Sequence, residues 1–209
     1  MYRPNAFRED DNDKLVAFMK ANSFATFVSM ANGQICASHI PLVVTVQDDV
    51  IKLSGHLAKQ NRQWQGFENA ESLAIFTGAH AYISPALYEK HESVPTWNYI
   101  AVHASGVPKI ITFNDSPESM AKMIEGMIST YEARYKSHWD GLSNRYREGM
   151  MKDIVGFEMT VTRLEGQYKL SQNRSLVDRQ NVSNALLQSS DPTARAVGVE
   201  MQQNLEANE

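Results

Sequence analysis

The sequence predicts a mainly β fold with helices (α+β), in which an antiparallel barrel is followed by a C-terminal helical segment. About six or seven short segments alternate apolar and polar residues, which is the period of a strand with one buried face. Turn residues suited to hairpins stand between several of these segments. Few helical patterns separate them, so an antiparallel barrel is favoured over a doubly wound sheet.

The first part of the chain is predicted to form a short helix and then an antiparallel meander. Asn12 can cap the helix, because its side chain can accept a hydrogen bond from a free backbone N–H. Asn32-Gly33 is the strongest hairpin signal, since both residue types tolerate the positive φ of a two-residue turn. A second turn falls at Gln47-Asp48-Asp49. The strands predicted around these turns are residues 24–30, 35–46 and 50–53.

The rest of the chain is predicted to add further strands and helices. Gly106 stands between two strand patterns and suggests a bulge or a tight corner. Ser116-Pro117-Glu118 opens a helix with a capping serine, a proline at the first helical position and an early acid. The predicted strands are residues 72–77 (continuing toward Ile83), 99–105, 107–112, 155–161 and 167–170. The predicted helices are residues 59–67, one from Pro117, one around Val182 to Leu187 and one from Asp191-Pro192.

Composition excludes several classes of protein. Hydrophobic residues make up 43% and charged residues 21% of the 209 residues, as in ordinary globular proteins. The formal net charge of -4 gives no general positive field, so any DNA contact would need a local basic patch. No apolar run approaches the roughly 20 residues of a membrane helix, and the N-terminal residues do not resemble a signal peptide.

The residues that usually carry catalysis or metal binding form no recognised pattern. Cys36 is the only cysteine, which excludes an intrachain disulfide and fits a reducing, cytoplasmic compartment. The six histidines show no metal-ligand spacing, so no metal site is expected. The chain lacks a nucleophile elbow, a Walker motif and a dinucleotide-binding glycine motif, and no catalytic residue is assigned.

Three polar clusters suggest one ligand that carries a phosphate. They are residues 54–61, 94–99 and 169–176, and each combines hydroxyl, amide or cationic groups. Ser54 and His56 share one face of a strand, and Lys59 falls where the following helix is predicted to begin, so the helix dipole would add to its charge. A solvated turn is the alternative interpretation.

Aromatic and imidazole rings stand close to these clusters. In an extended segment, Trp97 and Tyr99 point to one face and Asn98 to the other, which would suit a flat heteroaromatic ligand. The alternative is that both rings pack in the barrel core. His39 could reach a ligand or satisfy a hydrogen bond in the core.

Six motifs occur in an order that resembles the PaiB family of FMN-binding negative transcriptional regulators. The resemblance covers nearly the whole chain and implies a split-barrel flavin fold, related to the pyridoxamine-phosphate oxidases, that forms a homodimer with FMN near the interface. Residues 1–172 would be the FMN-binding domain, and residues 173–209 a helical appendage packed on the barrel or the dimer. The motifs are residues 1–4, 37–42, 55–61, 81–85, 94–99 and 169–174.

The resemblance also implies which residues bind FMN. It places one group near the phosphate and ribityl chain, His39 along the flavin edge, and a second group closing the site from the partner subunit. The first group is Ser54, His56, Lys59 and Asn61. The second group is Thr96, Trp97, Asn98, Lys169, Gln172 and Arg174.

Two classes of function follow. The first is a regulator that acts through flavin binding; direct DNA binding has little physical support, because Arg174, Arg179 and Arg195 are spread out along an acidic chain. The second is a flavin-dependent NAD(P)H oxidoreductase, in which the cofactor does the redox chemistry. A split barrel that binds haem is a further alternative.

Overall fold

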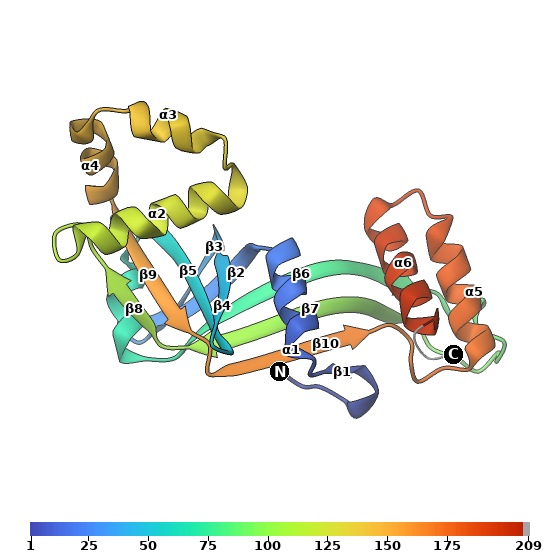
Figure 1. Cartoon of the computed structure of the whole chain (residues 1–209). Coiled ribbons are helices and arrows are strands. Elements are labelled where there is room, and N and C mark those ends of the chain that lie inside the picture. The colour runs from blue at the N-terminus through green and yellow to red at the C-terminus, as the bar shows by residue number, and fades with distance from the viewer. Residues whose placement is uncertain (207–209) are drawn as a thin grey trace. The chain divides into compact units, whose positions relative to one another are not determined.

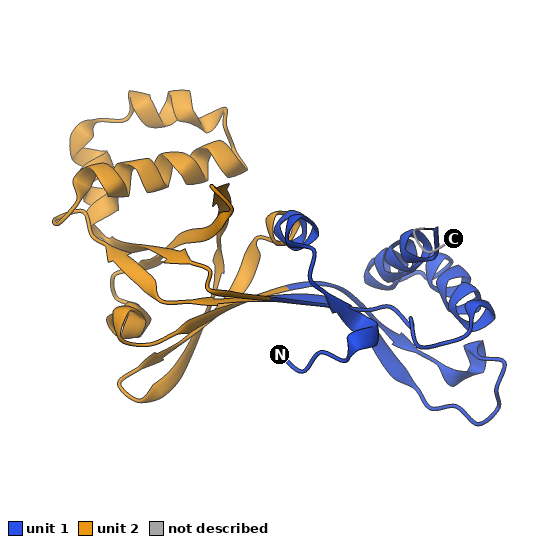
Figure 2. Ribbon diagram, turned by 60° about the horizontal axis from the view of Figure 1, so that its bottom comes forward, with its two compact units in different colours: residues 1–18, 77–102, 165–209 blue, residues 19–76, 103–164 orange. Residues whose placement is uncertain are grey.

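A computed structural model describes residues 1–206 (Figure 1). The chain divides into two compact units, shown in different colours in Figure 2. Unit 1 comprises residues 1–18, 77–102 and 165–209, and unit 2 comprises residues 19–76 and 103–164. The last three residues of the predicted C-terminal segment, 207–209, lie outside the described part. The predicted domain boundary at residue 172 stays a prediction.

The strands form two sheets, which confirms the predicted class of antiparallel sheets with helices. In spatial order, the six-stranded sheet contains β1 (Arg8–Glu9), β10 (Arg163–Lys169), β7 (Thr96–Gly106), β6 (Ser72–Ile83), β2 (Phe24–Ala31) and β3 (Gln34–Pro41). The four-stranded sheet contains β4 (Val43–Gln47), β5 (Val50–Ala58), β9 (Ile154–Thr160) and β8 (Pro108–Ile111).

Helices cover parts of both units. In unit 2, α2 packs on β4 and β5 and is followed by α3 and α4 (Figure 1). In unit 1, α5 and α6 pack against each other as a helical pair. The helices are η1 (Asn5–Phe7), α1 (Asn12–Ala21), η2 (Arg62–Asn69), η3 (Pro85–Leu87), α2 (Pro117–Tyr131), α3 (Tyr135–Gly141), α4 (Asn144–Lys152), α5 (Leu176–Leu187) and α6 (Pro192–Glu206). Within residues 1–206, none of them combines the length and apolar character of a membrane-spanning helix.

The core of unit 2 is centred on three aromatic rings. Phe27 on β2, Phe67 on η2 and Phe157 on β9 are fully buried, and their ring centroids lie 4.8 to 5.5 Å apart. Two of the three pairs are T-shaped, with the edge of one ring against the face of the other, an arrangement that the ring quadrupole favours. This cluster ties a strand from each sheet to the short helix η2.

The predicted turns are confirmed, whereas the predicted meander is wrong at one point. Asn32 (φ 52°) and Gly33 (φ 74°) join β2 to β3, and positive φ at Asp48 and Asp49 joins β4 to β5. The segment predicted as one strand over 35–46 breaks at Leu42, which is fully buried and donates its N–H to Ser23 O at 2.9 Å. Beyond it the chain enters the other sheet.

Gly106 is the predicted tight corner, because β7 belongs to one sheet and β8 to the other. A Cβ atom there would lie 2.2 Å from Thr160 O, so no larger residue fits. The predicted cap of α1 is wrong by one residue: the carboxylate of Asp11, not Asn12, accepts the N–H groups of Asp13 and Lys14.

Two helices, α3 and α4, were not predicted. An amphipathic helix is recognised from a stripe of buried apolar residues. In these two helices such a stripe is missing, because α3 has no buried residue and α4 buries only Met151.

Candidate flavin site

A cavity of about 120 Å³ lies in unit 1, where the end of β10 meets the start of β7. It has room for about four water molecules at roughly 30 Å³ each, which suits a phosphate-sized group rather than a three-ring flavin. Four residues that the sequence predicted as cofactor ligands line it. The lining residues are Tyr88, Val94, Pro95, Thr96, Asn98, Lys169, Ser171, Asn173 and Arg174.

Two cations line this cavity without an ionic partner. The Lys169 ammonium donates to Thr96 Oγ1 at 2.6 Å, and the Arg174 guanidinium lies 4.2 Å from the centre of the Tyr88 ring. Within residues 1–206 neither cation forms a salt bridge. Burial lowers the pKa of Lys169, because the charged ammonium is poorly solvated there. A bound anion would offset this cost.

Hydrogen bonds hold the loop after β10 in shape. Ser171 is buried and has a positive φ of 64°, which is costly for a residue other than glycine. The buried Asn98 amide donates to Ser171 Oγ at 2.9 Å. The Gln172 side chain spans the loop, accepting from Leu170 N at 2.8 Å and donating to Tyr168 O at 2.6 Å. Both ends of its amide are therefore engaged in the loop itself.

Trp97 lies on the opposite face of β7 from Thr96 and Asn98, as the two-residue period requires. Its side chain is 53% exposed, and its ring lies 6.2 Å from His80 and 6.0 Å from Tyr82. The interpretation of Trp97 as a core residue is therefore wrong. Equally, Trp97 does not line the cavity that its two neighbours line.

The remaining predicted ligands lie in unit 2. Ser54 and His56 are half-buried on one face of β5, as predicted. The His56 Nδ1 atom lies 3.4 Å from Met127 Sδ of α2. Lys59 is exposed and does not begin a helix, because β5 runs on to Ala58 and a turn follows. The helix predicted over 59–67 is the 3-10 helix η2, which starts at Arg62.

Asn61 belongs to a side-chain network that the sequence did not reveal. Its Oδ1 atom caps η2 by accepting from Gln63 N, and its Nδ2 atom donates to Ser38 Oγ at 2.9 Å. Ser38 donates to Gln63 Oε1 at 2.6 Å, and buried Gln63 donates to Phe27 O at 2.9 Å. In the sequence, nothing distinguishes Ser38 and Gln63 from other polar residues. Only the structure, in which Ser38 is half-buried and Gln63 is buried, shows that they belong to this network.

His39 is exposed, so a role as a core histidine is excluded. Its Nδ1 atom lies 3.0 Å from Thr26 Oγ1, and the Phe24 ring lies 6.5 Å away. The hydroxyl fixes the orientation of the imidazole and leaves Nε2 available to a ligand.

His56 predicts how stability depends on pH. Burial lowers the pKa of His56. Below about pH 6.5, the unfolded chain therefore binds a proton at this residue more readily than the folded protein does. The free energy of unfolding should therefore fall as the pH drops from about 7 to about 5. In flavin-free protein, urea unfolding across this range should show a shallower fall for His56→Gln. His91→Gln, at an exposed position, should follow the wild type, and parallel curves for His56→Gln and wild type would contradict the assignment.

Comparison with known proteins identifies the family. A family model described as "Putative FMN-binding domain" matches residues 1–163. The protease synthase and sporulation protein PAI 2 of Bacillus subtilis is 36% identical over 212 residues, which cover 98% of this chain and 98% of that protein. The chain belongs to the FMN-binding PaiB family. FMN is its cofactor.

Solved structures with the same fold include a conserved hypothetical protein of Mycobacterium tuberculosis and the flavocytochrome Anf3 of Azotobacter vinelandii. The first has a TM-score of 0.55 and 12% identity, and covers 84% of this chain and 94% of that chain. The second has a TM-score of 0.54 and 12% identity, and covers 80% of this chain and 72% of that chain. They confirm the split-barrel fold.

The side chains present fit FMN. A phosphate needs cations and hydrogen-bond donors, which Lys169 and Arg174 supply. The ribityl hydroxyls and the ring edge need neutral polar partners, and Ser54 and Asn61 in unit 2 are of that kind. When bound, FMN supplies the capacity to accept and release electrons, while the protein's side chains hold and orient it.

Proposed function

We propose that this protein is a homodimeric, cytoplasmic regulator that represses transcription through FMN binding rather than by contacting DNA directly. The observation that carries the proposal is the cavity in unit 1, which is lined by two cations that form no salt bridge in the described part of the chain. Membership of the PaiB family supports it, and the Bacillus subtilis relative is named for protease synthesis and sporulation.

We assign the FMN phosphate to Lys169 and Arg174 of one subunit. Thr96 accepts a hydrogen bond from Lys169, and Asn98 donates one to Ser171. The Gln172 side chain holds the loop after β10 in shape. The ribityl chain and ring would meet residues from unit 2 of the other subunit. These are His39, Ser54, His56, Lys59 and Asn61. Trp97, on the other face of β7, is assigned to the contact between subunits.

A dimer is supported by apolar side chains that unit 2 leaves in water. Phe24 is 70% exposed and Ile35 is 77% exposed, on the paired strands β2 and β3. Strand β3 stands at the edge of its sheet, where unpaired backbone groups favour association. Met30, which pairs with Ile35, is 39% exposed, so apolar side chains are exposed at both ends of this strand pair. Sedimentation should report twice the chain mass of 23.5 kDa.

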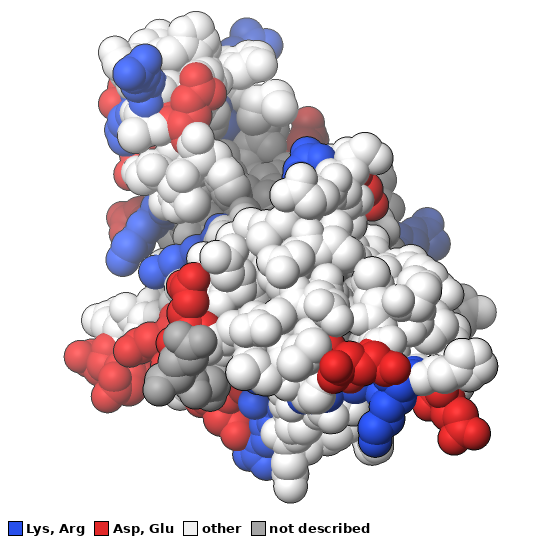
Figure 3. Space-filling view, turned by 90° about the vertical axis from the view of Figure 1, so that its right-hand side faces the viewer, with Lys and Arg blue, Asp and Glu red and all other residues white. Residues whose placement is uncertain are grey.

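Charge argues against direct DNA binding. The space-filling view in Figure 3 shows Lys and Arg mixed with Asp and Glu on the face toward the viewer, without a continuous basic area. The arginines of the C-terminal helices are balanced by acids at 178, 191, 200 and 206. A DNA-binding surface needs clustered cations to replace condensed counterions. Repression would therefore pass through a flavin-dependent contact with another component.

The test combines flavin binding with DNA binding. Titration with FMN should produce a saturable flavin absorption change, and the protein should shift no duplex DNA at low salt with or without FMN. Salt-sensitive binding of the flavin-free protein to DNA would overturn the indirect mechanism. Rapid reduction of bound FMN by NADH or NADPH in the same samples would favour the oxidoreductase instead. Failure to bind FMN would remove the proposal entirely.

A further inference from the structure

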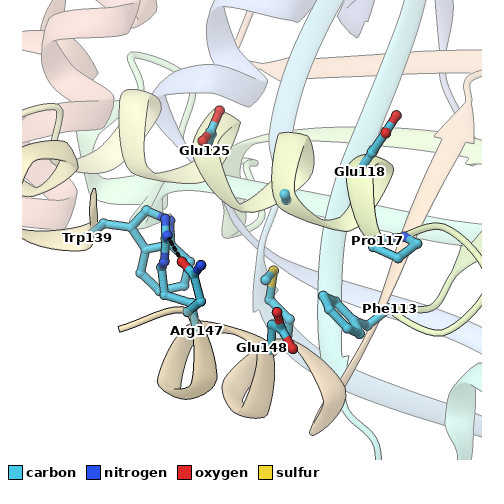
Figure 4. Close-up of a pocket in the computed structure, with 10 residues that line it drawn as sticks. Phe113, Pro117, Glu118, Glu125, Trp139, Arg147 and Glu148 are labelled. Carbon is cyan, nitrogen blue, oxygen red and sulfur yellow. Dashed lines mark hydrogen bonds between the residues drawn. The ribbon is translucent and has the colours of Figure 1, made fainter. Parts of the chain in front are cut away.

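A second cavity lies within unit 2, between α2, α3 and α4. Its volume is about 350 Å³, and small-molecule sites range from about 300 to 1,000 Å³. Trp139 and Arg147 lie toward one end and Phe113 and Pro117 toward the other (Figure 4). None of the residues that line it is assigned to FMN.

Part of the wall of this cavity is apolar. Met151 is 7% exposed and belongs to the buried cluster that also contains Met120 and Met123. Phe113 and Ala121 pack against the same cluster and line the cavity. A ligand that rests here removes apolar surface from water, which favours a hydrocarbon or aromatic body.

Arg147 is the one cation among the described residues that line the cavity. It is half-buried, and its Nη2 atom donates to Asn144 Oδ1 at 2.6 Å, which holds the guanidinium in place. Among residues 1–206 it has no carboxylate partner. A partly desolvated guanidinium without a counter-charge is a strong site for a carboxylate, which it can bind through two parallel hydrogen bonds.

The acidic residues that line the cavity are not counter-ions of Arg147. Glu125 lies 3.6 Å from Lys136, which also pairs with Asp140 at 2.6 Å, and Glu148 lies 3.6 Å from Lys152. Figure 4 shows the carboxylates of Glu118 and Glu125 turned away from the guanidinium. Within residues 1–206, none of these acids forms a salt bridge with Arg147.

Trp139 supplies a flat surface at the same end. It is half-buried, although most residues around it are exposed, and it lines the cavity (Figure 4). Within the described chain its indole N–H has no hydrogen-bond partner, so it is available as a second donor. Aromatic rings prefer such neighbours in offset or edge-on arrangements.

We propose that this cavity binds a small aromatic carboxylic acid. The carboxylate pairs with Arg147, and the ring lies along Trp139 and the apolar wall at Met151. The site is separate from the FMN residues, so the protein has a second ligand of a different chemical class. Binding here does not require FMN to be present.

Calorimetric titration of the full chain with 2-naphthoate tests the proposal. We expect saturable binding with one site per chain. The neutral analogue 2-naphthylmethanol should bind at least about tenfold more weakly, because it cannot form charge-assisted hydrogen bonds. Equal affinity for both compounds, tighter binding of 2-naphthylmethylamine, or no saturable binding of 2-naphthoate would overturn the proposal.

Matched variants locate the site. Arg147→Gln should weaken 2-naphthoate binding by about tenfold or more, and Arg147→Lys less, because lysine keeps the charge but loses the planar fork. Arg145→Gln, at an exposed position in the same helix, should bind as the wild type does. FMN titration should be unchanged in all three, which shows that they fold. Equal losses in Arg145→Gln and Arg147→Gln would place the binding elsewhere.

Discussion

Gly66→Ala should leave the protein largely unfolded or insoluble. A Cβ atom on Gly66 would lie 1.7 Å from Met30 O and 2.8 Å from the Met30 carbonyl carbon, so η2 could not stay packed on β2. The next residue, Phe67, belongs to the aromatic core cluster, and a shift of η2 would pull its ring away from Phe27 and Phe157. Overpacking against a backbone atom, which cannot rotate away, should cost about 3 kcal/mol or more of the free energy of unfolding.

Urea unfolding and the yield of soluble protein measure this effect. Gly149→Ala is the matched control, because Gly149 lies in α4 with nothing within 4 Å of its added Cβ. That change should stabilise the protein by about 0.5–1 kcal/mol, since alanine favours a helix over glycine. If Gly66→Ala unfolded at the same urea concentration as the wild type, the close packing of η2 on β2 would be wrong.

Removing the two cations of the unit 1 cavity should weaken FMN binding but leave riboflavin binding nearly unchanged. Lys169→Gln and Arg174→Gln each remove a charge-assisted contact to the phosphate, and such contacts contribute about 1.5–3 kcal/mol. Each change should therefore lower FMN affinity by about tenfold or more, and the double variant by more than either. Riboflavin lacks the phosphate, so the double variant should lose the wild-type preference for FMN.

Fluorescence titration with FMN and with riboflavin separates the phosphate from the ring. Lys90→Gln, an exposed lysine in unit 1 that does not line the cavity, is the control and should bind both compounds as the wild type does. Equal losses for FMN and riboflavin would show that the cavity does not hold the phosphate. If Lys59→Gln alone abolished the preference for FMN, the phosphate would lie at the end of β5 instead.

Features that depend on neighbouring residues were predictable. Asn32-Gly33 and Asp48-Asp49 adopt the positive φ that their turns require, and Pro117 opens α2 as predicted, whereas Ser116 makes no side-chain capping hydrogen bond. The alternation that separates Trp97 from Asn98 was also correct. Local chemistry decides each of these, because turn and capping preferences act over a few residues.

Features that depend on distant partners were not predictable. Whether Trp97 lies in the core or in water depends on what covers its face of β7. The Gln172 side chain could have met a ligand, but its two hydrogen bonds close its own loop. The guanidinium of Arg147 resembles any exposed arginine in sequence, and it becomes distinctive only because it lines a cavity between α2, α3 and α4 and forms no salt bridge there within residues 1–206.

The antiparallel class and the hairpin turns could be predicted from the sequence, because they follow from short-range periodicity and turn residues. The family, and hence the cofactor, could be predicted because the motifs consist of particular residues in a particular order. Only the tertiary structure shows that the chain changes sheets at Leu42, that Lys169 and Arg174 share a cavity, and that the Asn61 side chain caps η2. These outcomes depend on burial and on which charges remain unpaired. Both are properties of the packed chain, because desolvation and counter-charges are set by residues far apart in sequence.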